Sequence, residues 1–549
     1  MIVRVRSLKL QLDQEESLLP SLAAKKLGIS VDQLDELEIV RKSLDARRTT
    51  VHFVYTVDVD LLPKVKLPRE VLDSPEISIV QARPPVAPVP GETRLPSPPV
   101  IIGAGPAGLF CGLLLARHGY KPVIIERGRD VDRRIKDVEL FWEQGILDPE
   151  SNVQFGEGGA GTFSDGKLTT RIDDDRVDLV LKTMVEFGAP PEIIYEKRPH
   201  VGTDRLREII KKIRGEILSH GGKIYFQARA TDFLFEDDRM KGLVINDQLK
   251  IDSPVAVLAT GNSARDVYRA LNHWGVPLVV KGFAVGVRIE HPQALIDQIQ
   301  YGDYAGHPKL PPADYQITYQ DLETGRALYT FCMCPGGQII AGASEEGRVV
   351  TNGMSLYARD SGQANSALVV TVSPENLEED NPLAGVEFQE MLEARAYQAG
   401  GGGFKAPVQR VQDFLTRQAS VEAESSYRPG NTPANLWEVL PPQICGVIAR
   451  GLRKINQKMP GFVSPEAVLV GVETRTSSPI RVVRGPERVS TKIDGLYPCG
   501  EGAGYAGGIV SAAVDGLKVA ESIIARYARP QKTLEIEHPD IIKADPPIV

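Results

Sequence analysis

One segment, residues 99–126, constrains the fold of this chain more than any other. It reads PVIIGAGPAGLFCGLLLARHGYKPVIIE, in which two short apolar runs flank a glycine-rich turn and a helical pattern that ends at Gly119. The order strand, turn, helix, strand predicts a βαβ unit with buried parallel strands. We therefore expect an α/β domain built around a parallel sheet.

The glycines of this turn match the dinucleotide-binding pattern G-x-G-x-x-G. Gly103 permits the tight turn, Gly105 lets a pyrophosphate approach the backbone, and Gly108 lets the helix pack closely on the strand. Pro106 and Ala107 lie in the first helical turn, where unpaired N–H groups and the helix dipole favour an anion. The pattern predicts a bound dinucleotide but does not distinguish FAD from NAD.

Two further segments lead toward the same site. Glu126 ends the second apolar run and is placed to accept hydrogen bonds from an adenosine ribose. Residues 224–236 alternate as one strand, and residues 254–259 form a buried run whose following turn returns to the nucleotide crevice. The cofactor contacts expected here are Glu126, Arg127, Ala230, Ala259, Thr260 and Gly261.

A second phosphate-like loop lies near the C-terminus. Residues 495–504, GLYPCGEGAG, lead into two glycines and a helix of apolar period to about residue 527. The expected contacts here are Gly500, Glu501, Gly507, Gly508 and Ile509.

Together, the GAGPAG turn with Glu126, the LATG turn and GLYPCGEGAGYAGGI resemble FAD-dependent oxidoreductases of the glutathione reductase superfamily. More closely, residues 154–168, 282–293, 331–337 and 471–479 are similar to those of a bacterial family of uncharacterised FAD-dependent dehydrogenases, over about residues 100–528. The resemblance implies FAD and names no substrate. It also implies that Glu126 holds the AMP ribose, that Glu501 contacts the ribityl chain, and that the helix after Gly508 points at the flavin pyrimidine.

The glycine run at residues 156–161 follows no buried strand, so an independent NAD(P) site is not expected there. By resemblance to superfamily members with a glycine-rich loop at this place, it contacts the flavin; a purely structural turn is the alternative. The expected contacts are Gly159, Ala160, Gly161, Thr162, Ser164 and Lys167. Because the chain has one full fingerprint, NAD(P)H would dock only transiently.

The candidate catalytic residues are Lys167, Glu473 and Arg475, with Arg288 and Glu290 in similar polar stretches. An arginine can clamp an anionic substrate and a glutamate can move a proton, while salt bridges are the alternative. Cys332-x-Cys334 lacks the spacing of a redox or zinc motif, and two buried structural thiols are expected. No histidine pattern indicates a metal site.

Composition changes along the chain suggest five segments. We expect an α+β domain at residues 1–66, a proline-rich linker at 67–98, the first part of the FAD-binding domain at 99–262, a substrate or cap domain at 263–465, and the rest of the FAD-binding domain at 466–549. The expected fold class is α/β: a discontinuous, glutathione-reductase-type Rossmann-like domain with an inserted α+β domain and a small N-terminal α+β domain.

The net charge and the cysteine content limit which partners and which compartment are expected. A net charge of −8 offers no general attraction to nucleic acid or anionic lipid, and only Arg41, Lys42, Arg47 and Arg48 form a local basic cluster. The N-terminus lacks a secretory signal and five cysteines are scattered, so a cytoplasmic protein is expected, with no membrane partner and no indicated oligomeric state.

The expected function is that of an FAD-dependent oxidoreductase, a dehydrogenase passing hydride between an unidentified small molecule and flavin N5. One alternative is an NAD(P)H-dependent flavin reductase or monooxygenase. The other is a flavoprotein that docks nucleic acid through its N-terminal domain.

Overall fold

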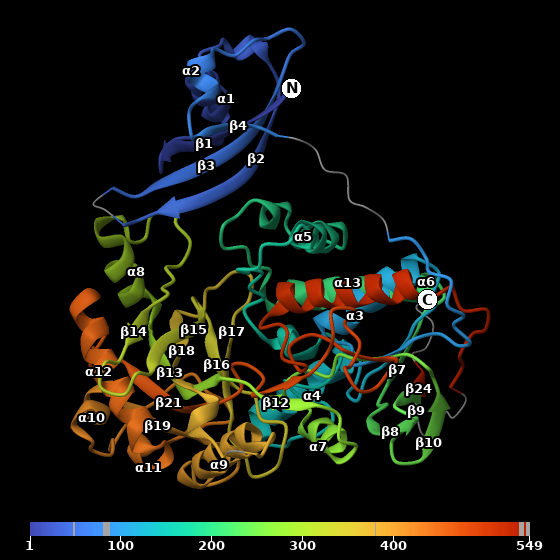
Figure 1. Ribbon diagram of the computed structural model, residues 1–549. Coiled ribbons are helices and arrows are strands. Elements are labelled where there is room, and N and C mark those ends of the chain that lie inside the picture. Colours follow the sequence, from blue (N-terminus) through green and yellow to red (C-terminus); the bar gives the residue numbers. More distant parts are fainter. Residues whose placement is uncertain (48–49, 81–87, 379, 537–542, 545–549) are drawn as a thin grey trace.

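The parallel sheet expected around the glycine turn is present in the computed structural model, which describes residues 1–47, 50–80, 88–378, 380–536 and 543–544 (Figure 1). Its order is β23-β11-β5-β6-β7-β24, parallel except for the last strand. The strands are β5 (Val100–Ile102), β6 (Val123–Ile125), β7 (Lys223–Phe226), β11 (Ala256–Leu258), β23 (Leu496–Pro498) and β24 (Lys543–Ala544). This mixed α/β, Rossmann-like architecture agrees with the expected fold class.

Helices cover one face of this sheet, and a small antiparallel sheet covers the other. The helices are α3 (Pro106–Arg117), α6 (Gly202–Ser219) and α13 (Ile509–Arg526); the small sheet holds β8 (Ala230–Glu236), β9 (Arg239–Ile245) and β10 (Leu249–Asp252). The prediction of one strand over residues 224–236 is wrong. Gln227 adopts a positive φ of 55°, so the chain turns there and the two halves enter different sheets as β7 and β8.

A seven-stranded sheet lies beside this domain, in the order β14-β15-β18-β13-β21-β19-β20. Its strands are β13 (Phe283–Pro292), β14 (Thr318–Gln320), β15 (Ala327–Cys334), β18 (Gln363–Val372), β19 (Ala406–Arg410), β20 (Asn431–Pro433) and β21 (Val468–Glu473). β21 lies beyond residue 465, where the inserted domain was expected to end. The helices that pack against it are α8 (Gln293–Tyr301), α9 (Ala384–Ala399), α10 (Val411–Thr416), α11 (Leu436–Val439) and α12 (Pro442–Lys458).

Shorter elements connect the two large sheets. β12 (Leu278–Val280) pairs with β22 (Ile480–Val482), and β16 (Gln338–Ala341) pairs with β17 (Thr351–Met354). Three further helices of the main body are α4 (Val131–Gln144), α5 (Arg176–Glu186) and α7 (Arg265–His273). Within the described residues, no helix is long and apolar enough to cross a membrane.

The N-terminal residues form a separate four-stranded sheet, β2-β3-β1-β4, above the rest of the molecule (Figure 1). It contains β1 (Ile2–Gln11), β2 (Leu34–Asp45), β3 (His52–Leu61) and β4 (Ile77–Ile79), with α1 (Leu19–Leu27) and α2 (Arg69–Leu72). β2 was not anticipated, and α2 and β4 lie within the range expected to be an extended linker. The edge strand β2 contacts the main body, because the Lys42 N–H donates to Tyr195 O and the Lys197 N–H donates to Lys42 O, at 2.8 and 2.9 Å.

Candidate functional site

Four segments predicted to hold a dinucleotide meet at the carboxyl ends of the parallel strands. Gly103 follows β5, Glu126 follows β6, Ala259 follows β11 and Gly500 lies shortly after β23. In sheets of this kind the ligand binds in the crevice outside these strand ends.

The glycines at this edge divide into two groups. A Cβ at Gly103 would overlap the carbonyl oxygen of Ala259, and one at Gly108 would overlap the carbonyl oxygen of Gly103, so both are required for packing. A Cβ at Gly105 would meet only Gly159 Cα at 3.8 Å, and at Gly261 it would meet nothing within 4 Å. Gly507 and Gly508 likewise face open space. The second group forms a cradle that fits the pyrophosphate and flavin of FAD.

The carboxylate of Glu126 ties the glycine turn to the next loop. It is buried, and it accepts hydrogen bonds from the N–H groups of Ala104 and Gly156 at 2.8 Å and of Gly128 at 2.9 Å. A carboxylate has about four lone-pair positions, so one remains for a ribose hydroxyl. The neighbouring Arg127 side chain is instead held by ion pairs with two acidic residues, Glu150 and Asp266.

The loop at residues 156–164 packs against both phosphate-type turns. The Gly158 N–H donates to Ala104 O at 2.8 Å, and a Cβ at Gly161 would lie 3.2 Å from Ile509. Thr162 is buried and donates to Glu157 O at 3.0 Å. The Ser164 hydroxyl donates to Gly161 O at 2.7 Å. The side chains of Thr162 and Ser164 therefore stabilise the loop itself. The loop backbone, including that of Ala160, lies beside the cradle.

Arg134 on α4 fixes this loop, and nothing in the local sequence pattern indicates it. Its fully buried guanidinium donates to the carbonyl oxygens of four loop residues: Asn152, Val153, Gly156 and Glu157. Burial lowers the pKa of Arg134 to about 9. The loop therefore closes around a buried cation.

The C-terminal motif is positioned by α13. Asp515 accepts from the Gly500 N–H at 2.7 Å and pairs with Arg484 at 2.6 Å. Glu501 accepts from Asn262 Nδ2 at 2.9 Å, and desolvation raises the pKa of Glu501 to about 7. α13 begins at Ile509, and among the described residues no side chain caps that end. This leaves the positive end of the helix dipole beside the cradle.

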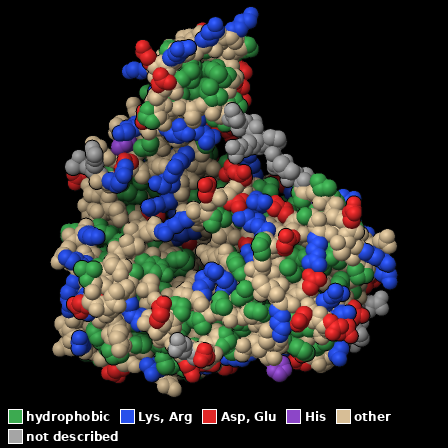
Figure 2. All heavy atoms as spheres, viewed as in Figure 1, with side chains coloured by type: hydrophobic (Ala, Val, Ile, Leu, Met, Phe, Trp, Pro, Cys, Tyr) green, Lys and Arg blue, Asp and Glu red, His purple; other side chains and the backbone are tan. Residues whose placement is uncertain are grey.

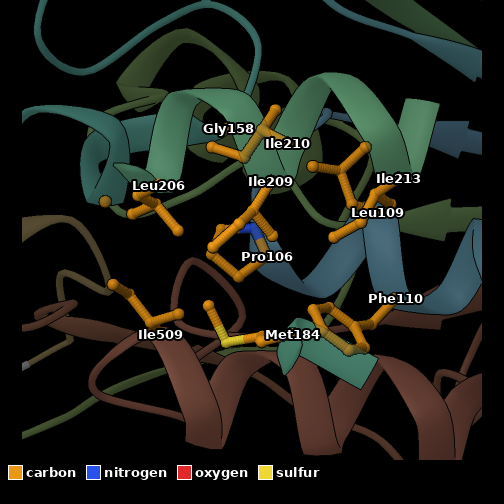
Figure 3. Close-up of a pocket in the computed structure, with 11 residues that line it drawn as sticks. Pro106, Leu109, Phe110, Gly158, Met184, Leu206, Ile209, Ile210, Ile213 and Ile509 are labelled. Carbon is orange, nitrogen blue, oxygen red and sulfur yellow. The ribbon is translucent and has the colours of Figure 1, made fainter. Parts of the chain in front are cut away.

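An apolar pocket lies behind the glycine turn, between α3, α6 and the start of α13 (Figure 3). Its lining includes Pro106, Phe110, Met184, Ile209 and Ile509, whose side chains point toward one another. The lining does not suit a phosphate, so it supports the turn by packing.

Within the seven-stranded sheet, Arg288 on β13 and Glu473 on β21 form a buried ion pair. Arg288 Nη1 lies 2.9 Å from both carboxylate oxygens, and Arg288 Nε donates to Asn365 Oδ1 at 2.6 Å. Thr351 Oγ1 donates to Glu473 at 3.2 Å. Burial raises the pKa of Glu473, although Arg288 opposes this, so the carboxyl can hold a proton more readily than an exposed one.

Lys167 is partly exposed and bridges the loop to the seven-stranded sheet. Its Nζ donates to Met333 O and lies 3.1 Å from Asp165 Oδ2. Asp165 is buried and also pairs with Arg359 at 2.6 Å. Burial opposes ionisation of Asp165, but Lys167 and Arg359 lower its pKa to about 2.

The guanidinium of Arg475, which was expected to clamp a substrate, instead binds other side chains of the protein. Its nitrogens donate to Glu393, Ser344 and Glu345, in a network that Arg265 completes. Glu290 is likewise bound to Ser426 N at 2.8 Å. The contacts of Arg475 match the salt-bridge alternative, whereas those of Glu290 are hydrogen bonds to a serine.

The cysteines of the C-x-C motif differ in exposure. Cys334 is buried as expected, but Cys332 is partly exposed, so the interpretation of two buried thiols is wrong for Cys332. The cause is a bulge: regular pairing of β15 with β18 breaks between Phe331 and Cys334, and Cys332 has a φ of 45°.

Two of the four residues of the basic cluster of the N-terminal sheet form ion pairs. Lys42 binds Glu16 at 2.6 Å and Arg47 binds Asp45 at 2.7 Å, while Arg48 lies outside the described residues. No group of three or more His, Cys, Asp or Glu in the described part of the chain could hold a metal ion.

Comparison with known proteins identifies three matching families. Residues 282–476 match "FAD-dependent protein, C-terminal domain-like", residues 101–146 match "NAD(P)-binding Rossmann-like domain", and residues 1–60 match a domain of unknown function. An uncharacterised protein of Clostridium beijerinckii is 46% identical over 535 residues, covering 97% of this chain and 100% of that protein.

Solved structures are more distant. A halogenase, PltM, in complex with FAD is 11% identical with a TM-score of 0.37, over 80% of this chain and 72% of the halogenase. Glycine oxidase from Bacillus cereus is 12% identical with a TM-score of 0.32, over 79% of this chain and 99% of the oxidase.

Proposed function

Because the chain belongs to a family of FAD-dependent oxidoreductases, the one that includes the Clostridium protein, we propose that it is a dehydrogenase that passes hydride between a small molecule and N5 of its FAD. When bound, FAD supplies the hydride acceptor or donor, and the protein supplies binding, orientation and electrostatics.

In this proposal the residues at the crevice hold the cofactor. The backbone at Gly103–Gly108 and the start of α3 bind the pyrophosphate, and Glu126 binds the adenosine ribose. The remaining contacts come from the loop backbone at residues 159–164, from the turn at residues 259–261, from Gly500 and Glu501, and from the helix start at residues 507–509. The open glycine cradle supports this assignment.

The observation that carries the proposal is where the Arg288–Glu473 pair lies. Its sheet is joined to the flavin-binding segments by the hydrogen bonds from Lys167 to Met333 O and from Asn262 to Arg475 O, the latter at 3.2 Å. Asn262 also binds Glu501 of the C-terminal loop, so this contact supports assigning the titratable Glu473, two residues before Arg475, to the part of the sheet next to the cradle. A hydride transfer coupled to proton loss needs a group that takes the proton, and a carboxyl near the flavin can serve as that group.

We assign the proton to Glu473. Its carboxylate takes the proton that the substrate loses as hydride departs, and Arg288 holds the carboxylate in place. Lys167 binds an anionic part of the substrate. Lys and Arg side chains gather in the hollow beneath the N-terminal sheet (Figure 2), which favours such a substrate electrostatically.

The test is anaerobic mixing of the yellow holoenzyme with a panel of small alcohols, amines, and hydroxy and amino acids, followed by the flavin absorbance. Bleaching by one of these supports the proposal. Bleaching by NADH or NADPH alone favours the flavin reductase or monooxygenase alternative. Purified protein that binds no FAD, added or co-purified, would refute the dehydrogenase proposal and both alternatives, because each requires a bound flavin. Salt-dependent binding of nucleic acid would instead support a docking role for the N-terminal domain.

A further inference from the structure

One amide side chain joins the turn after β11 to the C-terminal loop (residues 500–504) and to the segment that follows Glu473. Asn262 Nδ2 donates to Glu501 Oε1 at 2.9 Å and to Arg475 O at 3.2 Å. The nitrogen must be the atom that faces Arg475, because a backbone carbonyl can only accept. An amide nitrogen carries two hydrogens, so these two bonds use both of them.

The two residues that follow Glu473 are bound to α9. Thr474 Oγ1 donates to Glu393 at 2.7 Å, and Thr474 O accepts from Gln389 Nε2 at 2.8 Å. The Arg475 guanidinium binds the same Glu393 through two nitrogens, at 3.0 and 2.9 Å. Glu393 is completely buried, so this segment moves with the seven-stranded sheet and the helices packed on it.

The C-terminal loop is bound to the other domain. A Cβ at Gly502 would lie 2.3 Å from Gly261 O, so the loop packs directly on the turn that precedes Asn262. The Tyr268 hydroxyl, on α7, donates to Gly502 O at 2.7 Å. The bonds of Asn262 therefore cross from the parallel-sheet domain, which holds Glu501, to the seven-stranded sheet.

The bond from Asn262 favours the ionised form of Glu501, because a donated hydrogen bond stabilises a carboxylate. Burial is the main cause that raises the pKa of this carboxyl. The charged groups that face it are Lys281, which lowers the pKa, and Cys332, which raises it. A change of charge at Glu501 therefore changes the strength of its bond to Asn262.

We propose that Asn262 is a positioning residue that couples the C-terminal loop to Glu473, an inference that rests on the proposed function. With both hydrogens engaged, the amide sets the distance between the proton-accepting carboxyl and the flavin that the loop contacts. Such distances matter, since a displacement of about 1 Å can slow a reaction by about a hundred-fold. When FAD binds and orders the loop, the same amide holds the segment that follows Glu473.

The first experiment measures the bond itself, by denaturant unfolding of FAD-free protein from about pH 4 to about pH 9. Asn262→Ala removes the donor, so the pKa of Glu501 rises, and the fall in stability with rising pH should extend to higher pH by about one pH unit. In a Glu501→Gln background, the same substitution should cost an amount that does not change with pH. A pH-independent cost in the wild-type background as well would overturn the bond.

The second experiment measures the coupling, by hydrogen exchange of backbone amides with and without FAD. In the wild type, FAD should slow exchange in the C-terminal loop and also in residues 474–479. In Asn262→Ala, FAD should protect the loop alone. Asn431→Ala, which removes a partly buried amide of β20, should behave like the wild type.

The wild type alone keeps the test decisive if Asn262→Ala misfolds. Protection of the C-terminal loop without protection of residues 474–479 would overturn the coupling and leave the dehydrogenase proposal standing. Protection of both segments in Asn262→Ala would also overturn it. Protein that binds no FAD would overturn the proposed function itself, whereas the unfolding experiment would still decide whether Asn262 binds the ionised Glu501.

Discussion

The guanidinium of Arg288 and the carboxylate of Glu473 pair across neighbouring strands, with Nη1 2.9 Å from both carboxylate oxygens and both side chains almost completely buried. A buried pair of this kind is weak as a source of stability, because desolvating two charges offsets much of their attraction. Its value to the protein is therefore positional: the carboxyl is held at one place and in one orientation.

Glu473→Gln should separate this positional role from proton transfer. The amide keeps the shape and can still accept from Arg288, but it cannot take a proton, so flavin reduction by the substrate should slow by about 10²–10⁴-fold with FAD retained. Stopped-flow absorbance gives the rate. Glu424→Gln, at an exposed carboxylate, is the matched control. A variant as fast as this control would remove Glu473 from the chemistry.

Gly105→Val should yield a folded protein without FAD. A Cβ at Gly105 meets only Gly159 Cα at 3.8 Å, so the chain tolerates it, whereas the branched side chain fills the space for the pyrophosphate. FAD affinity should fall at least about a hundred-fold, or about 2.7 kcal/mol, with circular dichroism unchanged. Gly108→Val, which collides with Gly103 O, should lose the fold as well. Stoichiometric FAD in Gly105→Val would show that the turn does not bind phosphate.

Gly507→Asp tests the helix start against the flavin. Gly507 faces open space and needs no left-handed backbone, so a side chain there causes no strain. At about 5 Å and an effective dielectric of about 20, the new charge opposes reduction by roughly 3 kcal/mol, or about 60 mV for a two-electron couple. Redox-dye titration measures the potential, and the neutral Gly507→Asn controls for size. Equal potentials in the two variants would mean that α13 does not point at the isoalloxazine.

Glu501 should give the stability of the protein a distinct pH dependence. Desolvation raises its pKa to about 7, so between about pH 4 and that value the folded chain holds a proton that the unfolded chain has lost. The free energy of unfolding therefore falls as pH rises through this window.

Glu501→Gln has no carboxyl to titrate, so its free energy of unfolding does not fall in this way as pH rises. The variant should be more stable than wild type above pH 7, by up to about 3 kcal/mol, with no difference near about pH 4. Melting temperatures of FAD-free protein across this range measure it, with the exposed Glu422→Gln as control. A constant offset at every pH would contradict the assigned titration.

Local pattern was enough to predict the βαβ unit, the tight turn at Gly103, the close packing at Gly108 and the convergence of the strand-end turns. Each depends on periodicity or on a turn within a few residues. The break at Gln227 was missed, because alternation continues through it while one backbone angle redirects the chain.

The polar contacts were harder to predict, because they join distant residues. Arg134 reaches carbonyls some twenty positions away, and Arg288 reaches Glu473 across 185 positions. Arg475 was expected to bind substrate, yet its partners come from a helix and a loop that no motif marks. The exposure of Cys332 depends on a bulge that the flanking sequence does not predict.

The discontinuity of the parallel sheet has a consequence for how the protein is made. β23 and α13 complete a domain whose strands β5, β6, β7 and β11 have all been made by Leu258, and the Gly91 N–H donates to Ile524 O at 2.8 Å. At about 5–20 residues per second, a ribosome needs roughly 10–50 s to travel from β11 to β23. During that time the apolar face of α3 and one edge of β11 lack their partners, so the nascent chain must be shielded from aggregation and can take up its cofactor only after synthesis is nearly complete.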